Sequence, residues 1–165
     1  MILAMLKLLV NFSLFKDLAQ KDLEIIAPLF HQSSYPAGTL VIEQGQPAID
    51  LHLLVSGEVT LRYKPYDGET INLNDIHPGG VFGWSAVLGN PVYSSSVVCK
   101  TDCTALVIKG ADLRSLTPRH PETAHIIMNR LADAVSARWE DARMQVRSMV
   151  QKGIADNISP MGKKD

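Results

Sequence analysis

The chain has 165 residues, of which 46% are hydrophobic and 20% are charged, and this balance is typical of one soluble globular domain with a short tail. Its formal net charge of −1 at pH 7 speaks against direct nucleic-acid binding, because domains that bind DNA or RNA carry a basic excess or stripe. Cys99 and Cys103 are too few cysteines for a disulfide framework, and they indicate a reducing compartment, the cytoplasm.

The first ten residues are apolar apart from Lys7. They lack the basic segment and the cleavage site of a signal peptide, and they are too short to span a bilayer, so no membrane role is expected. We interpret them as a helix that packs on the domain; a fragment of a longer upstream segment is the alternative. A second short helix is predicted from Lys16 to Leu29, closed off by Pro28 and Pro36.

Residues 33–108 have the pattern of many short antiparallel strands separated by turn residues. In residues 59–64 the apolar side chains of Val59, Leu61 and Tyr63 alternate with polar ones, as in a strand with one buried face. Asp67-Gly68 follows as a hairpin turn. Uniformly apolar runs, expected of strands inside a closed roll, occur at Leu40 to Ile42, Leu51 to Val55 and Ala105 to Ile108. The pattern predicts a mainly β fold, an antiparallel β-roll of the jelly-roll type with flanking helices.

After the strands the apolar period becomes helical. A short helix is predicted from Gly110 to Leu116, ended by Thr117 and Pro118, and a long helix from Glu122 to about Lys152. The long helix carries an apolar stripe at Ile127, Leu131, Ala134, Val135, Ala142, Val146 and Met149.

A helix of about 30 residues is roughly 45 Å long, more than a small roll can cover. We therefore predict a homodimer that pairs through helix 122–152, the alternative being a helix folded back over its own domain. The domain is expected to span 1–152, and residues 153–165, which follow Gly153 and include Pro160 and two lysines, are expected to be a disordered tail.

The segment from Pro78 to Leu88 is the one most suggestive of ligand binding. Glycine there permits positive φ and a close approach of the backbone to a ligand. The amides of Ser85 and Ala86 would be free at a helix start, where an anion is favoured. With the hydroxyl groups of Ser94, Ser95 and Ser96 they would cradle one phosphate, although glycine-rich turns before helices also occur without a ligand.

The order of the motifs resembles the cyclic-nucleotide-binding domain family, the sensor part of catabolite-activator and Fnr-type regulators and of protein kinase A regulatory subunits. The resemblance runs from about Leu14 to Val146. Its pieces are Leu14-Phe15-Lys16-Asp17-Leu18, Tyr35-Pro36-Ala37-Gly38-Thr39-Leu40-Val41, Gln44-Gly45, Leu54-Val55-Ser56-Gly57-Glu58-Val59, Pro78-Gly79-Gly80-Val81-Phe82-Gly83 and Lys100-Thr101-Asp102-Cys103. It implies an eight-stranded β-roll that holds a ligand, cAMP or cGMP, and dimerises through the long helix.

The chain departs from that family at the two positions that bind the nucleotide. Trp84 stands where the family has a glutamate that accepts the ribose 2′-hydroxyl, and Tyr93 or Ser94 stands where it has the arginine that neutralises the phosphate. Loss of that arginine removes a charge-assisted contact, and such bonds are roughly twice as strong as neutral ones. Arg138, on the long helix, aligns with an arginine that reaches the nucleotide in some family members; a snorkelling arginine at the dimer seam is the alternative.

The expected ligand contacts are therefore Gly83, Trp84, Ser85, Ala86, Tyr93, Ser94, Ser95 and Arg138. Trp84 either stacks on a purine or fills the vacated pocket as part of the core. The five histidines and two cysteines form no metal-ligand spacing, so no metal is expected, and an axial haem ligand would have to be His77 or Cys99.

No catalytic motif is recognisable, and no recognition helix for DNA follows the long helix, so neither an enzyme nor a DNA-binding protein is expected. The sequence predicts a regulatory sensor that binds cAMP, cGMP or a related small ligand. The alternative is a dimerisation or interaction module that has lost cyclic-nucleotide binding or senses another small ligand.

Overall fold

The computed structural model describes residues 2–136 of the chain. The chain divides into two units, residues 1–131 and 132–165. The described part of the second unit, residues 132–136, is helical. The elements discussed below belong to the first unit, except where helix 121–136 continues past residue 131.

Four short helical segments begin the chain: α1 (Ile2–Leu9), the 3₁₀ helix η1 (Ser13–Phe15), α2 (Gln20–Ile26) and the 3₁₀ helix η2 (Ala27–Leu29). The helix predicted over residues 16–29 thus begins later than expected. Asp17 has a left-handed φ of 61°, which a continuing α-helix cannot accommodate, and Ala19 precedes the first turn of α2 in an extended conformation.

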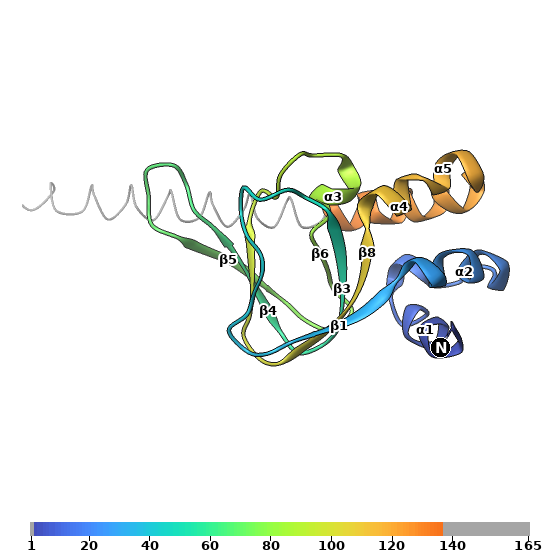
Figure 1. The fold of residues 1–165 in the computed structure, drawn as a ribbon, viewed down its shortest axis with the longest axis horizontal. Helices are drawn as coiled ribbons and strands as arrows, with labels where there is room; N and C mark the ends of the chain where they lie inside the picture. Colours follow the sequence, from blue (N-terminus) through green and yellow to red (C-terminus); the bar gives the residue numbers. More distant parts are fainter. Residues whose placement is uncertain (1, 137–165) are drawn as a thin grey trace, which may run out of the picture. The chain divides into compact units, whose positions relative to one another are not determined.

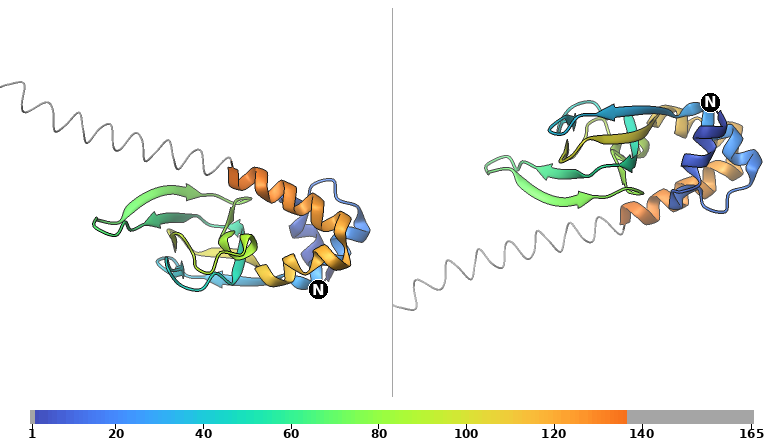
Figure 2. Two further views of the ribbon diagram at one scale, coloured as in Figure 1. Left: turned by 90° about the horizontal axis from the view of Figure 1, so that it is seen from above. Right: turned by 90° about the horizontal axis from the view of Figure 1, so that it is seen from below.

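Within the described residues, eight strands form two four-stranded antiparallel sheets, which confirms the predicted β-roll (Figure 1). The first sheet has the order β1-β8-β3-β6 and the second the order β2-β7-β4-β5. Their bounds are β1 (His31–Tyr35), β2 (Leu40–Ile42), β3 (Asp50–Ser56), β4 (Val59–Tyr63), β5 (Ile71–Ile76), β6 (Val81–Phe82), β7 (Ser96–Cys99) and β8 (Cys103–Lys109). Helices α1 and α2 lie with α4 (Gly110–Arg114) and α5 (Leu116–Arg119) at one end of the roll (Figure 2).

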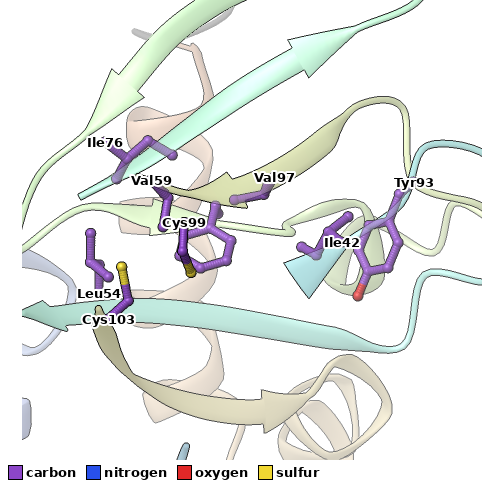
Figure 3. Close-up of a cluster of buried hydrophobic side chains, with 9 residues drawn as sticks. Ile42, Leu54, Val59, Ile76, Tyr93, Val97, Cys99 and Cys103 are labelled. Atoms are coloured by element: carbon purple, nitrogen blue, oxygen red, sulfur yellow. The ribbon is translucent and has the colours of Figure 1, made fainter. Parts of the chain in front are cut away.

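The space between the sheets is filled by apolar side chains from both of them (Figure 3). The buried members of this core are Ile42, Leu54, Val59, Ile76, Phe82, Tyr93, Val97, Cys99 and Cys103. The alternation predicted for β4 holds for Val59 and Leu61 but not for Tyr63, which is exposed near the hairpin end. Thr60, expected on the polar face, is buried, and its hydroxyl group donates to Asp75 Oδ1 at 2.8 Å. A cross-strand hydrogen bond therefore makes its burial tolerable.

The helical segment after β8 is divided differently from the prediction. α4 ends at Arg114 and α5 begins at Leu116, so Thr117 and Pro118 lie inside a helix instead of ending one. Pro118 is the third residue of α5, in the first turn, where a missing backbone N–H removes no intrahelical hydrogen bond.

The next helix occupies residues 121–136 of the described chain, and its first turns are held by the N-terminal segment. Arg130 Nη1 donates to the carbonyl oxygens of Ser13, Leu14 and Lys16, and the Thr123 hydroxyl donates to Asp22. One guanidinium group thereby ties three carbonyl groups near η1 to the helix.

Two residues of the predicted dimer stripe are already covered within one chain. Ile127 and Leu131 are each 1% exposed, so the chain's own first unit covers this part of the stripe. Leu131, which was expected to pair with a second copy, is therefore not available to a partner. The remaining predicted seam is largely in residues 137–152, which lie outside the described residues together with the expected tail. No helix among residues 2–136 is long and apolar enough to cross a membrane.

The candidate ligand site

The connection between β6 and the short helix α3 (Ser85–Leu88) begins the segment from Gly83 to Ser96, called the cassette below. Gly83 has a φ of 82°, and a Cβ placed on it would lie 2.7 Å from the carbonyl oxygen of Asp50 and 3.0 Å from Ile42 Cδ1. Both the conformation and the space therefore require glycine at this position. The sequence predicted a close approach of the backbone to a ligand here; in the described chain the close neighbours of Gly83 are Asp50 of β3 and Ile42 of β2.

The amide groups at the start of α3 are partly used inside the cassette. Ala86 N donates to the Gly83 carbonyl at 3.2 Å, and Val87 N donates to the Trp84 carbonyl at 2.9 Å. The expectation that the Ala86 amide is free for an anion was therefore wrong. A helix of four residues closes its own turn with these groups, and both Ser85 and Ala86 are buried.

Tyr93, at or next to the sequence position of the resembling family's arginine, lies in the core. Its side chain is 8% exposed, and its hydroxyl group donates to the Asp50 carbonyl at 2.8 Å and accepts from the Asp50 amide at 2.9 Å. Burial raises the pKa of this phenol above its usual range, so it stays protonated. Gly83 and Tyr93 are thus brought together across one residue of β3, Asp50.

The chain on either side of Tyr93 is joined to the loop between β2 and β3. Gly45 N donates to the Tyr93 carbonyl at 2.9 Å, Tyr93 N donates to the Gln46 carbonyl at 2.9 Å, and Ala48 N donates to the Pro91 carbonyl at 3.1 Å. The hydroxyl oxygen of Ser96 accepts from Gln44 N at 2.9 Å. One of the three predicted serines therefore bonds to this loop, and the cassette is held in shape by the chain itself.

The remaining predicted contacts differ in how accessible they are. Ser94 is exposed, and Trp84 and Ser95 are half-buried. Arg138 lies outside the described residues. Within the described chain, then, the predicted contact residues that are not buried are Gly83, Trp84, Ser94 and Ser95.

The far side of α3 rests on α4, through contacts that sequence reasoning missed. A Cβ on Gly110 would lie 2.1 Å from the Ala86 carbonyl oxygen, and Arg114 Nη1 donates to the same oxygen. The sequence signal for this contact is a glycine directly after a strand, where close packing of two elements is common.

His52 is a second residue that sequence reasoning missed. It is 4% exposed on β3, its ring stacks on Phe82 with 4.8 Å between centroids, and its Nδ1 has no hydrogen-bond partner among the described residues. A Cβ on Gly83 would lie 3.4 Å from that nitrogen. Burial first, and the charge of His31 second, lower the pKa of His52 from 6.5 to about 4, so its ring is neutral at pH 7.

A separate open groove of about 710 Å³ lies along β2, β4 and β7. Arg62 and Lys64 contribute its cations, and of the three predicted serines it includes Ser96. Arg62 is paired with Ser96 across the strands, whereas Leu61 is paired with the core residue Val97. Because neighbouring residues of a strand point to opposite faces, this groove lies on the face of the sheet that is turned away from the core.

The two cysteines are buried, unbridged thiols at the turn between β7 and β8. Burial and the neighbouring Cys103 raise the pKa of Cys99 to about 12, which makes it an unreactive thiol. His77, the other candidate haem ligand, is 71% exposed and lies 3.7 Å from Glu58 Oε1. Over the described range 2–136, no three His, Cys, Asp or Glu residues are grouped to hold a metal ion.

Comparison with known proteins agrees with this geometry. The family model for the cyclic nucleotide-binding domain matches residues 32–120. The cyclic AMP receptor protein of Thermus thermophilus is 28% identical over 156 residues, which are 90% of this chain and 72% of the relative. A putative potassium channel protein of Rhodopseudomonas palustris is 32% identical over 126 residues, but this chain spans only 30% of the channel's length.

A solved structure shows the same fold. The structure of a putative cyclic nucleotide-binding protein from Geobacter metallireducens superposes with a TM-score of 0.70 at 28% identity. The superposition covers 79% of this chain and 95% of that one. The likeness therefore includes nearly all of the neighbour.

Proposed function

The chain belongs to the cyclic nucleotide-binding domain family, and from this premise we propose that it is a regulatory sensor domain that binds cAMP, cGMP or a related small ligand and catalyses no reaction. The observation that carries the proposal is that the cassette is already ordered in the folded chain. Gly83 supplies the positive φ at its start, Ser96 bonds to the β2–β3 loop, and the Tyr93 hydroxyl group bonds to Asp50 at the start of β3. Such a preformed segment lowers the ordering cost of binding.

In this proposal the residues named from the sequence divide into two roles. Gly83, Trp84, Ser94 and Ser95 contact the ligand, and Arg138 adds a contact from the long helix. Ser85, Ala86 and Tyr93 are buried and act by setting the shape of the cassette. The supporting observation is that Gly83, Trp84, Ser94 and Ser95 are exposed or half-buried, whereas the other three are buried.

The signal would leave the site through α3 and α4. Ala86 in α3 contacts Gly110 and accepts a hydrogen bond from Arg114. A displacement of the cassette on ligand binding would therefore move residues of α4. Helix 121–136 follows α4 and α5 in the chain. We expect the continuation of this helix to pair with its copy, so that ligand binding and dimer geometry are coupled. Two unbridged thiols fit a reducing, cytoplasmic setting.

A thermal-shift titration with cAMP and cGMP, and with adenosine and guanosine as related ligands, tests the proposal. A ligand that binds the folded chain stabilises it by RT ln(1 + [L]/Kd), about 2.7 kcal/mol at a hundredfold excess over Kd. Ser94→Glu, which adds an anion within the cassette, should weaken the response to cyclic nucleotides. Ser34→Glu, on exposed β1, is the matched control and should not. A flat response to all four ligands up to millimolar concentration would contradict the proposed function.

A further inference from the structure

The cassette carries no charge of its own. Residues 83–96 contain no aspartate, glutamate, lysine, arginine or histidine. The residue at the position of the family's arginine, Tyr93, is buried, and its hydroxyl group is already bonded to both backbone groups of Asp50. It has neither a charge nor a free proton to offer a phosphate.

The cations that the structure describes near the cassette have other surroundings. Arg62 and Lys64 line the groove on the face of the sheet turned away from the core. Arg114 donates to the Ala86 carbonyl on the α4 side of the cassette. Lys109 is exposed at the end of β8, opposite Asp50 in the strand register. Arg62, Lys64 and Arg114 are therefore directed away from the ligand side of the cassette.

The polar side chain nearest to Gly83 on the core side is also uncharged. His52 faces the glycine from β3, with an enclosed Nδ1 that lacks a partner in the described chain. Because burial lowers its pKa to about 4, the ring carries no charge at pH 7. The inner wall of the cassette is therefore neutral as well.

The accessible groups favour a different chemistry. Trp84 and Ser95 are half-buried and Ser94 is exposed, and the side chains of these residues are an indole and two hydroxymethyl groups. An indole stacks on flat rings, and hydroxyl groups both donate to and accept from neutral polar groups. Among the described residues of the cassette, an anion that leaves water would find neutral donors but no cation, and neutral donors do not repay its desolvation.

Resting on the proposed function, we propose that the part of the ligand that faces the cassette is uncharged, so that the site takes a flat aromatic base attached to a hydroxyl-bearing sugar, as in a nucleoside, in preference to a cyclic phosphate. The preference follows from the neutral cassette and from the use of the Tyr93 hydroxyl inside the core. It concerns the same site and narrows the class of ligand.

The test is isothermal titration of the full chain with two matched pairs, adenosine with cAMP and guanosine with cGMP. In at least one pair the nucleoside should bind at least tenfold more tightly than its cyclic phosphate. If in neither pair the nucleoside binds at least tenfold more tightly than its cyclic phosphate, while some of these ligands bind, the inference is overturned and the proposed function stands. If none of the four binds, the proposed function fails and the inference fails with it.

Ser94→Arg tests the cause of the preference, because Ser94 is exposed and tolerates a long side chain without disturbing the core. In this variant the ratio of the affinity for the cyclic phosphate to the affinity for the nucleoside should rise at least tenfold. Ser94→Gln, of similar reach and no charge, should leave this ratio unchanged. An unchanged ratio in Ser94→Arg would overturn the electrostatic argument.

Arg138→Gln examines the one candidate cation that the sequence named on the long helix. If the inference holds, this variant keeps the order of affinities of the unmodified chain. A cyclic nucleotide that binds the unmodified chain best and loses at least tenfold in Arg138→Gln would show that Arg138 neutralises the phosphate, and would overturn the inference.

Discussion

At the scale of single residues, His52 is enclosed by apolar neighbours although its Nδ1 lacks a hydrogen-bond partner in the described chain. An unsatisfied buried polar atom costs about 1–3 kcal/mol, and an apolar ring of the same shape removes that cost. His52→Phe, which keeps the stack on Phe82, should therefore raise the free energy of unfolding by about 1 kcal/mol in urea titrations. His77→Phe at an exposed position should change it by less than about 0.5 kcal/mol. A clear loss of stability in His52→Phe would mean that Nδ1 has a partner in solution.

The same residue predicts a pH dependence. The pKa of His52 falls from 6.5 in the unfolded chain to about 4 in the folded one, so between these values the unfolded state binds more protons. The contribution of neutral His52 to the free energy of unfolding is fully present above pH 6.5. It is lost as the pH drops toward 4, by roughly 3 kcal/mol in all. Hydrogen bonds from Lys100 and Thr60 lower the pKa of Asp75 below 3.8, so its contribution is lost at more acidic pH.

The measurement is the free energy of unfolding from pH 7 to pH 4 for the unmodified chain and for His52→Phe. The variant should show a much smaller loss in this window. Equal losses in both proteins would assign the acid sensitivity to other groups.

The hydroxyl group of Tyr93 makes two hydrogen bonds, to the backbone amide and the carbonyl group of Asp50. Tyr93→Phe keeps the ring in the core but removes both hydrogen bonds to Asp50. Unfolding titrations should show a loss of about 1–3 kcal/mol. Tyr66→Phe is the matched control, because Tyr66 is fully exposed, and it should be neutral. If Tyr93→Phe is equally neutral, the hydroxyl does not hold the cassette to β3.

At the scale of elements, the contact between α3 and α4 depends on the absence of one side chain. Gly110→Ala places a Cβ 2.1 Å from the Ala86 carbonyl oxygen, although alanine is the better residue for a helix. The steric clash should outweigh the higher helix propensity of alanine and lower the free energy of unfolding by about 1–3 kcal/mol. Gly89→Ala meets open space and suffers only from its φ of 79°, so we expect a loss of about 1–2 kcal/mol.

The two glycine variants should differ in the hydrogen exchange of α4. Thermal unfolding measures the loss of stability in each variant. Hydrogen exchange of the amides in α4 should be faster in Gly110→Ala and unchanged in Gly89→Ala. Unchanged exchange in α4 of Gly110→Ala would mean that the two helices are not mechanically coupled.

The elements also show where sequence patterns stop being informative. The strands were predictable because alternating or continuous apolar runs of this length, separated by turn residues, suit short strands and are too brief for helices. The start of α2 was not, because Asp17 adopts a positive φ that no residue pattern marks. The division between α4 and α5 was missed because Pro118 was taken as a helix end, whereas its position in a first turn permits it.

At the scale of the whole molecule, the dimer prediction now concerns a shorter stretch of helix. Leu131 is buried within its own unit, whereas Val135 is half-buried in the single chain. Val135→Glu combined with Val146→Glu should give a monomer by light scattering while the roll stays folded. Ala132→Glu, at an exposed position, is the control that keeps the dimer.

Leu131→Glu provides the contrast. Placing a charge at a buried position should lower the free energy of unfolding of the roll itself by several kcal/mol. An unchanged mass for the Val135 and Val146 double variant would refute pairing through this helix.

By itself the sequence determined the β-roll, the order of its elements and the place of the cassette, because periodicity, turn residues and motif order are local properties of the chain. It also showed that the cassette lacks the expected charged residues. Only the tertiary structure decided how Tyr93, Ser96 and Ala86 use their polar groups, since their partners Asp50, Gln44 and Arg114 are 28–52 residues away in sequence. Hydrogen bonds over such distances depend on how the strands are packed, and no local pattern records that packing.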